Sequence, residues 1–433
     1  MSGRRATVGL IGVKAANAVL GILTVVLFAR WMGAGEYGLY VFAITLVQFV
    51  AVPLHFGLPT LLVRETAVLV QAGNLSLLRG LLRWSYGLIL AGTAVVLALG
   101  LAALALFGGE GGIVGLTGNG PIVVMAALTV PLIALNKLTL GVLNGLRRTV
   151  ASRVPDGLVR PGLVLLLGAV AMWVGWLDAT SMVGFYLAAA FLAALVGLAM
   201  TQRALPREIG AAPATYAGRA WLTSLLPLTA IAAVQMLKNQ TDIVMLGLLS
   251  ADIAEVAQYK VAAQLATLPL ILQTVANAIL APRIAAAHAA GNLSALNAQV
   301  TRVTRWVAGG TVAFLLPLVL FGNRLIPAVF GADYAPAFIP LVLLALGIAF
   351  TSASGATTTL LNMCGLESRT ARLATWSALA NVVLNLALIP LLGAAGAALA
   401  TAITTVAMQL GALHHCRKRL GFVPHVLGPM RPR

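Results

Sequence analysis

Charged residues and cysteines are scarce in this chain. Only 9% of its 433 residues are charged and 2 are cysteines, whereas 60% are hydrophobic. Because a soluble globular domain usually carries about 25% charged residues, the composition excludes that class. A long chain with so little to offer water is expected to lie in a membrane.

Motifs for a metal, a nucleotide or covalent catalysis are also lacking. Cys364 and Cys416 lie near predicted cytoplasmic ends, where a disulfide is not expected. His414, His415 and Cys416 are consecutive, which is poor spacing for metal ligands on a helix. The sequence contains no glycine-rich nucleotide loop, no His-Glu-x-x-His and no nucleophile elbow. We therefore expect no enzyme, and no cofactor apart from a coupling ion, Na⁺ or H⁺.

Apolar runs of membrane-spanning length recur along the chain. Each has about 20 residues, enough for a helix to cross roughly 30 Å of hydrocarbon. Their polarity does not alternate, which excludes a membrane β-barrel. We expect an all-α integral membrane protein with about 12 transmembrane helices. The predicted spans are 8–29, 38–62, 84–107, 121–143, 158–177, 180–201, 222–249, 254–280, 304–326, 337–361, 372–392 and 394–415.

Acidic residues are few, and the basic residues are unevenly placed. The chain has 28 Lys and Arg against 11 Asp and Glu, a net charge of +17. Nearly all arginines that flank the spans fall on one side, and only Arg30 and Arg324 fall on the other. This is the positive-inside pattern, so the charge does not indicate a nucleic-acid partner. We expect a multi-pass protein of the cell inner (cytoplasmic) membrane with both termini cytoplasmic.

Two short matches indicate an internal repeat. "GNLSLL" at 73–78 returns as "GNLSAL" at 291–296, and Asn144 corresponds to Asn362 with the same offset along the chain. The sequence predicts two six-helix lobes, residues 1–208 and 209–433, the second ending in a short basic cytoplasmic tail. Because six is even, both lobes enter the membrane in the same orientation. A polar linker at 202–220 is expected to join them on the cytoplasmic face.

Loose motifs in both halves point to a family. The first half contains "ARWMGAGEYGLYVFAITL" (29–46) and "FGLPTLLVRETA" (56–67), and the second contains "DIVMLGLLSADIAEVAQYKVAAQL" (242–265). With these motifs the chain resembles the polysaccharide-transporter branch of the multidrug/oligosaccharidyl-lipid/polysaccharide exporter superfamily, which includes O-antigen type lipid-linked oligosaccharide flippases. The matching residues are Ala29, Arg30, Gly33, Glu36, Tyr37, Gly38, Gly57, Leu58, Arg64, Asp242, Leu246, Gly247, Val256 and Tyr259.

The resemblance implies a flippase that moves a polyprenyl-pyrophosphate-linked oligosaccharide from the cytoplasmic to the outer leaflet, in a polysaccharide biosynthesis route. Transport of this kind works by alternating access of a cavity between the lobes. The implied partners are the lipid-linked glycan and membrane lipids. A glycan polymerase or glycosyltransferases acting on the same glycan would be further partners.

Lysines inside predicted spans suit such a substrate. Four of them together cost about 10 kcal/mol on insertion scales, so we expect them in a hydrated interior that receives the anionic diphosphate. Amide side chains are expected on the same helix faces as these lysines. The candidate substrate-binding residues are Lys14, Arg30, Arg64, Lys137, Lys238, Lys260, Gln235 and Gln264. The alternatives are snorkelling of the lysines toward the membrane surface, neutralisation of Lys238 by Asp242, and arginines that only set topology.

One acidic residue lies deep inside a predicted span. Asp242 belongs to the second half, as do Asn381 and Asn385, which are one helical turn apart. A carboxylate with two amide oxygens suits Na⁺, and the carboxylate alone can carry a proton. We therefore expect an ion-coupling site here, with helix–helix hydrogen bonding as the alternative.

Two other functions remain open at this stage. A multidrug or toxin cation antiporter of the same superfamily would need an acidic or aromatic cavity, which four lysines disfavour. A membrane-embedded glycan polymerase or glycosyltransferase would need a large outer loop or an acidic cluster. The predicted outer loops, such as 108–120, are short.

Overall fold

The computed structural model describes residues 3–55, 57–107, 120–291, 297–421 and 425–426. Inside its helices, the side chains of residues 3–8, 10, 11, 99–107, 230, 231, 238 and 239 are not described. Several sequence predictions therefore lie outside the described residues: the outer loop 108–119, repeat residues 292–296, the Lys238 side chain, and the tail residues Arg431 and Arg433.

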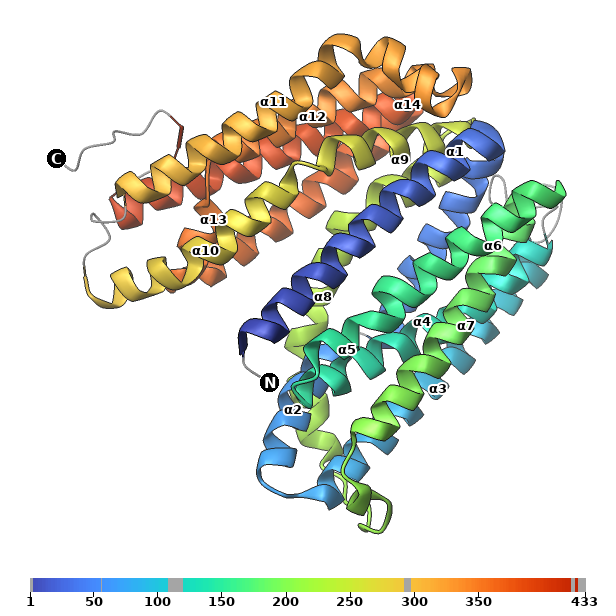
Figure 1. Ribbon diagram of the computed structural model, residues 1–433, viewed down its shortest axis with the longest axis vertical. Helices are drawn as coiled ribbons and strands as arrows, with labels where there is room; N and C mark the ends of the chain where they lie inside the picture. The colour runs from blue at the N-terminus through green and yellow to red at the C-terminus, as the bar shows by residue number, and fades with distance from the viewer. Residues whose placement is uncertain (1–2, 56, 108–119, 292–296, 422–424, 427–433) are drawn as a thin grey trace. The chain divides into compact units, whose positions relative to one another are not determined.

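The regular elements in the described ranges are all helices (Figure 1). This confirms the predicted all-α class. In chain order the elements are α1 (Gly3–His55), α2 (Leu58–Gln71), α3 (Leu75–Phe107), α4 (Gly120–Gly145), α5 (Thr149–Val154), the π-helical turn η1 (Pro155–Val159), α6 (Arg160–Val174), α7 (Ala179–Ala204), η2 (Arg207–Gly210), α8 (Gly218–Leu249), α9 (Ala254–Thr267), α10 (Leu270–Ala289), α11 (Asn297–Phe330), η4 (Ala332–Ala337), α12 (Phe338–Ala353), α13 (Thr357–Met363) and α14 (Glu367–Leu420).

Ten helices in the described ranges are long and apolar enough to cross a membrane. The predicted count of about 12 is not confirmed. Two of the ten, α1 and α14, each contain two helical segments joined at a glycine with non-helical angles, Gly33 (φ 73°, ψ 173°) and Gly393 (φ 56°, ψ −132°). Figure 1 shows the chain turning back on itself within each of these two elements. In α14 the two segments pack antiparallel, since Asn381 bonds Thr401 (3.0 Å) and Ser377 Oγ bonds the Thr404 carbonyl (3.1 Å).

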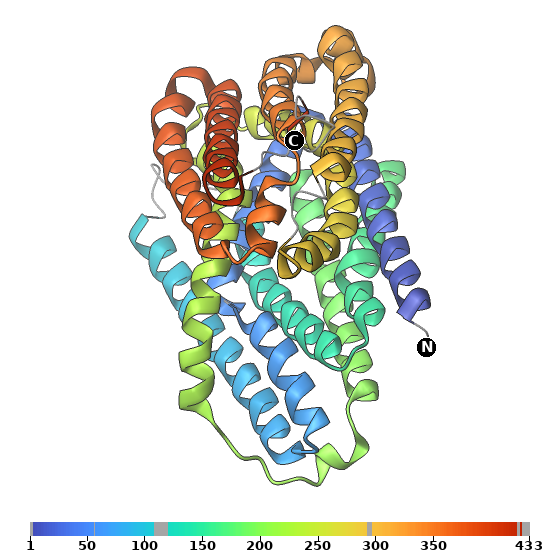
Figure 2. The same cartoon turned by 90° about the vertical axis from the view of Figure 1, so that its left-hand side faces the viewer.

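The chain divides into two compact units, residues Met1–Gln240 and Thr241–Arg433. The division falls inside α8. The lobe boundaries at 208 and 209 stay a prediction. The predicted linker 202–220 packs on unit 1, where it crosses α3 (Figure 2): Thr215 N–H bonds the Ser76 carbonyl at 3.1 Å, and Gly80 leaves no room for a side chain beside Thr215.

The same helix-end hydrogen bonds occur in each unit, at positions separated by the offset that the sequence repeat shows. The end of α2 has a bond from Ala72 N–H to the Val68 carbonyl (2.9 Å), and the end of α10 has the matching bond from Ala290 to Ala286 (3.0 Å). The residue after each is a left-handed glycine, Gly73 (φ 67°) and Gly291 (φ 69°). The two bonds and the two glycines are separated along the chain by the same number of residues as the repeated sequence motifs. The duplication is therefore present in the helix ends as well as in the sequence.

A carboxylate caps a helix N-terminus in each unit. In unit 1, Glu36 Oε2 accepts a 2.8 Å bond from the N–H of Ala179, the first residue of α7. In unit 2, Glu255 Oε2 accepts a 3.1 Å bond from the N–H of Ala394, directly after the Gly393 kink. A negative charge at this end of a helix is stabilised by the free N–H groups and the helix dipole. The Glu-Tyr-Gly motif therefore has a structural role in unit 1.

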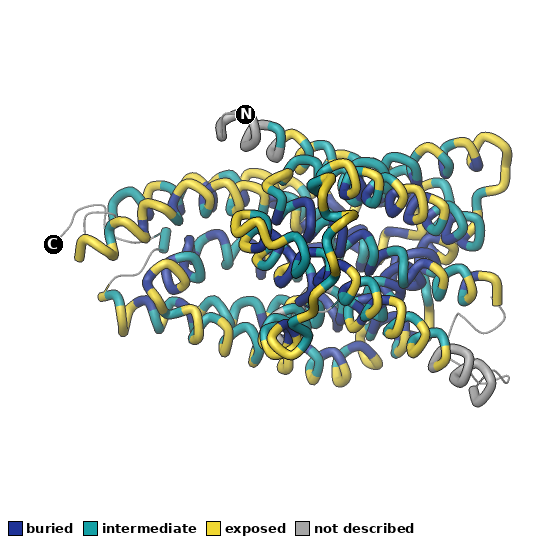
Figure 3. Tube along the Cα trace, turned by 90° about the horizontal axis from the view of Figure 1, so that it is seen from below, coloured by how far each residue is buried: buried dark blue, intermediate teal, exposed yellow. Residues whose placement is uncertain are grey.

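Burial alternates along the helices, so each has a packed face and an outward face (Figure 3). Outward positions include large apolar side chains such as Leu90 (70% exposed) and Leu226 (71% exposed). Packed positions include close approaches of small residues: a Cβ on Gly145 would lie 2.6 Å from Thr66 Cβ, where α4 meets α2. Apolar outward faces with small-residue contacts inside are what a bilayer favours.

Candidate substrate and ion sites

Unit 1 contains a pocket of about 330 Å³ lined by both polar and apolar side chains. It is formed where the C-terminal half of α1, the start of α2, and parts of α4, α6 and α8 approach one another. The lining residues are Gln48, Val52, His55, Gly57, Pro59, Thr60, Ile133, Lys137, Arg160, Ala232, Gln235, Met236 and Gln240.

Two basic side chains and one carboxylate set the charge of this pocket. Lys137 Nζ lies 2.8 Å from Asp156 Oδ2, and Arg160 Nη1 lies 3.2 Å from Asp156 Oδ1. The Lys137 side chain is 34% exposed, whereas those of Arg160 and Asp156 are 19% and 12% exposed. Because two cations share one carboxylate, one positive charge is left over, and Lys137 is the most accessible of the three.

The π-helical turn η1 positions this charged group. Asp156 lies inside η1, and Arg160 begins α6 immediately after it. The Arg160 guanidinium carbon lies 5.4 Å from the centre of the Tyr186 ring, a cation–π distance. Single π-helical turns occur frequently at functional sites. Here the turn holds the arginine between a carboxylate and an aromatic face.

The remaining polar groups of the pocket are neutral hydrogen-bonding side chains. Gln240 Nε2 donates to Gln48 Oε1 at 3.1 Å, and Gln235 lines the wall on the same helix as Gln240. His55 Nδ1 lies 3.1 Å from the Val52 carbonyl. Amide groups of this kind bind hydroxyl groups as donors and as acceptors.

The structure brings only some of the predicted substrate-binding residues into this pocket. Lys137 and Gln235 line it. Lys14 and Arg30 are exposed on α1 and do not line it. Arg64 is exposed on α2 and forms an ion pair with Glu65 at 2.8 Å. The Lys238 side chain lies outside the described residues.

Sequence reasoning missed Asp156 and Arg160. Asp156 falls between the predicted spans 121–143 and 158–177, and Arg160 is the third residue of the second of these. Apart from Arg30 and Arg64, the sequence gives no reason to separate an arginine near a span end from the positive-inside pattern. The signal that could have separated this one is its i,i+4 spacing from an acidic residue, since most other arginines have none.

Unit 2 places the three predicted ion-coupling residues together. Asp242 Oδ1 accepts a bond from Asn385 Nδ2 at 2.7 Å, and Asn385 also bonds Asn381 Oδ1 at 3.1 Å. Asp242 Oδ2 accepts bonds from Tyr259 (2.5 Å) and Thr401 (2.6 Å), two residues that were not assigned to the site from the sequence. The carboxylate therefore has donors on both oxygens.

This cluster is rich in oxygen atoms. Asn385 is buried, and its Oδ1 has no hydrogen-bond partner among the described residues. The hydroxyl of Thr401 and the carbonyl oxygen of Asn381 lie in the same network. Oxygen ligands of this type suit Na⁺, whereas the described residues contain no group of three His, Cys, Asp or Glu that could hold a transition metal.

Lys260 and Gln264 lie on α9 of unit 2, one turn apart and partly buried. The Lys260 side chain has no hydrogen bond or ion pair within the described parts of the chain. An unpaired lysine on a largely buried helix requires water or an anion near its ammonium group.

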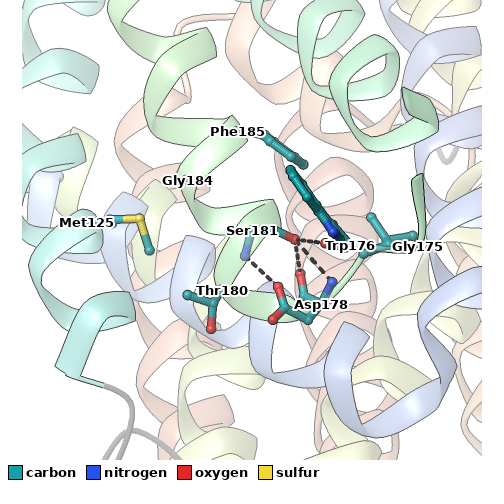
Figure 4. Close-up of a pocket in the computed structure, with 9 residues that line it drawn as sticks. Met125, Gly175, Trp176, Asp178, Thr180, Ser181, Gly184 and Phe185 are labelled. Carbon is teal, nitrogen blue, oxygen red and sulfur yellow. Dashed lines mark hydrogen bonds between the residues drawn. The ribbon is translucent and has the colours of Figure 1, made fainter. Parts of the chain in front are cut away.

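A larger and more open pocket of about 790 Å³ lies at the start of α7 (Figure 4). Two of its polar side chains, Asp178 and Ser181, already make hydrogen bonds within the protein. Asp178 Oδ1 accepts from Ser181 N–H at 2.7 Å, and Ser181 Oγ donates to the Trp176 carbonyl at 2.8 Å, which together cap the helix. A carboxylate with no basic neighbour in the wall does not suit an anionic ligand, so this pocket is not the substrate candidate.

Comparison with known proteins relates this chain to a family. A family model described as "Polysaccharide biosynthesis protein" matches residues 4–288. No curated protein matches the sequence.

Solved structures share the fold. The lipid II flippase MurJ in an inward closed conformation superposes with a TM-score of 0.75 at 15% identity, over 94% of this chain and 87% of that one. An inward-facing multidrug resistance MATE family transporter of the MOP superfamily has a TM-score of 0.69 at 15% identity, over 92% and 94%. A MOP superfamily transporter from Pyrococcus furiosus has a TM-score of 0.61 at 14% identity, over 95% of each chain. On the strength of the match to its N-terminal two thirds, the chain belongs to the polysaccharide biosynthesis protein family.

Proposed function

We propose that this protein is a flippase that moves a lipid-linked oligosaccharide, attached through a pyrophosphate to a polyprenyl chain, from the cytoplasmic to the outer leaflet. The family match supports a role in polysaccharide biosynthesis, and the shared fold supports transport. O-antigen type glycans are one substrate class within the family that the sequence motifs resemble. The lobes alternate the access of the substrate to the two sides.

The observation that carries this proposal is the excess positive charge in the pocket of unit 1. Arg160 presents a planar guanidinium, which binds phosphate oxygens through two parallel hydrogen bonds, and Lys137 adds a mobile point charge. Asp156 holds both side chains in place at 2.8 and 3.2 Å. A pyrophosphate that enters displaces part of this pairing and gains two cationic partners.

The size and neutral groups of the pocket fit the head of such a substrate. Its volume of about 330 Å³ lies at the small end of ligand pockets, which range over roughly 300–1,000 Å³. It accommodates a pyrophosphate with part of one sugar, while the rest of the glycan and the lipid tail extend outside. Gln48, Gln235 and Gln240 are then available to sugar hydroxyls.

We propose further that ion coupling takes place at Asp242 in unit 2. A Na⁺ would be held by the carboxylate with oxygens of Asn381, Asn385 and Thr401, and a proton would be held by the carboxylate alone. The unpaired Asn385 Oδ1 supports the first of these. The partly buried Lys260, with Gln264 beside it, offers a further cationic contact for an anionic group in this unit.

The experiment is transport of a fluorescent polyprenyl-pyrophosphate sugar in proteoliposomes, with the outward fraction measured by quenching. Lys137→Met and Arg160→Gln should each reduce the initial rate about tenfold or more, because each removes a charge-assisted contact of about 1.5–3 kcal/mol. Arg153→Gln, an exposed position on α5, is the control and should keep the rate. If both pocket variants transport at the control rate, the pocket is not the binding site.

A multidrug cation antiporter is the second candidate, because the fold is also that of multidrug transporters. The pocket of unit 1 disfavours it, since Asp156 is already shared by two basic side chains. Efflux of an organic cation such as ethidium from the same proteoliposomes, in place of glycan-lipid transport, would reverse this ranking.

A further inference from the structure

Arg147 has an unusual backbone conformation at the end of α4. Its φ of 59° is the only positive φ at a non-glycine residue in the described ranges. The N–H of Arg147 bonds the Asn144 carbonyl and the N–H of Arg148 bonds the Leu143 carbonyl, both at 2.9 Å. This is the Schellman ending of a helix, in which the left-handed position is usually glycine.

The second copy of the repeat provides an internal comparison. At the same offset along the chain, Gly365 occupies the left-handed position with φ 73°. Leu366 N–H bonds the Leu361 carbonyl at 2.9 Å, the counterpart of the bond made by Arg148. The two helix ends are built alike, yet one uses the unstrained residue and the other an arginine. A side chain held in a strained conformation suggests that its chemistry is used.

The Arg147 side chain lines a pocket of about 380 Å³ between α2 and the end of α4. Ala67, Val70 and Leu146 form an apolar wall, and Gln71 adds an amide beside the guanidinium. Gly145 lets α4 approach Thr66 of α2 closely, which fixes this edge of the pocket. The Arg147 side chain is exposed and makes no hydrogen bond or ion pair within the described part of the chain.

The need for a positive charge that sets membrane topology does not explain why an arginine occupies position 147. Arg148 and Arg153 are exposed close by and place positive charge at the same end of unit 1 without a left-handed backbone. A charge that only sets orientation can stand at any nearby position, since the positive-inside effect depends on the number of basic residues near a span. Position 147 differs from these in facing the pocket.

We propose that Arg147 and Gln71 bind the phosphate of an anionic phospholipid, whose acyl chain lies along the wall formed by Val70 and Leu146. A membrane lipid fits better than free phosphate, because the pocket joins a cationic group to an apolar wall at the end of α4, a helix long and apolar enough to cross a membrane. The end of unit 1 concerned is the one that the basic loops predict to be cytoplasmic. This site is separate from the substrate pocket and does not depend on the flippase activity.

The test uses the purified full-length protein in nanodiscs of phosphatidylcholine, with and without phosphatidylglycerol. Arg147→Gly should raise the melting temperature by about 2 °C in phosphatidylcholine, because the backbone strain is removed. It should also weaken binding of phosphatidylglycerol about fivefold, because one basic contact to an anionic lipid is lost. Arg147→Gln keeps the backbone strain and loses the charge. It should therefore bind phosphatidylglycerol as weakly as Arg147→Gly does, but without the rise in melting temperature.

Arg153→Ala is the matched control, since it removes an exposed arginine of the same end that does not line the pocket. It should leave both readouts close to the wild type. The proposal is overturned if Arg147→Gln binds phosphatidylglycerol as the control does. It is also overturned if inorganic phosphate stabilises the wild type as strongly as the lipid does, because the apolar wall would then have no part in binding.

Discussion

The substitution Asp242→Asn offers the sharpest test of the polar cluster in unit 2. In the wild type the carboxylate accepts bonds from Tyr259 (2.5 Å), Thr401 (2.6 Å) and Asn385 (2.7 Å). Asparagine has nearly the same shape, so packing is kept. It removes the negative charge and replaces one acceptor oxygen by an N–H donor that faces the existing donors.

The size of the effect follows from these contacts and from ion binding. Each hydrogen bond to a charged group contributes about 1.5–3 kcal/mol, and the hydroxyls of Tyr259 and Thr401 can turn to accept from the new amide, so the structural loss should be near the lower value. An ion present at a hundred times its dissociation constant adds about 2.7 kcal/mol to the wild type. For a unit of this size that corresponds to a melting temperature higher by about 5–10 °C.

Thermal unfolding should be compared in sodium chloride and in choline chloride at equal ionic strength. The wild type should melt higher in sodium, and Asp242→Asn should melt at the same temperature in both salts. Asp252→Asn, an exposed position ten residues further along, should keep the sodium effect. If Asp242→Asn retains the full shift, sodium binds elsewhere. If the wild type shows no shift with sodium but loses transport when the proton gradient is collapsed, the carboxylate carries a proton.

Two glycines give the remaining predictions. Gly393→Ala should lower the free energy of unfolding by about 3 kcal/mol, because φ is 56° and the new Cβ would collide with the Glu255 carboxylate. Gly145→Ala should cost about 1–3 kcal/mol by overpacking against Thr66 Cβ at 2.6 Å. Both are measured by thermal unfolding in detergent, with Gly309→Ala in α11 as the control, since nothing lies within 4 Å of that position. If either variant melts at the same temperature as Gly309→Ala, the close contact at that glycine does not exist.

The helices were predictable because each needs only local information. A run of apolar residues long enough to cross a membrane forms a helix, since a bilayer offers no other partner to the backbone. The two glycine kinks were harder to read from the sequence. Gly33 and Gly393 join helical segments that were expected as separate spans, and the positive φ that distinguishes them from other glycines depends on backbone geometry.

The candidate sites also contain some residues that the sequence could predict and others that it could not. Asn381 and Asn385 could be paired from their spacing, because residues four apart share a helix face. Thr401 and Tyr259 could not be added to them, since a hydroxyl on an apolar helix gives no sign of its partner until the helices are packed. Asp156 was missed because its position between two predicted spans suggested a loop.

The duplication gives an independent reason to assign function to the charged group of unit 1. At the offset of the repeat, Lys137 and Arg160 correspond to Gly355 and Ala378 in the second half. The helix ends of that half keep the hydrogen bonds of the first half without these cations. The scaffold therefore does not require them, and a charged group that is costly to place in a membrane must be retained for another reason. This is why the Lys137 and Arg160 variants should fold normally while they lose transport.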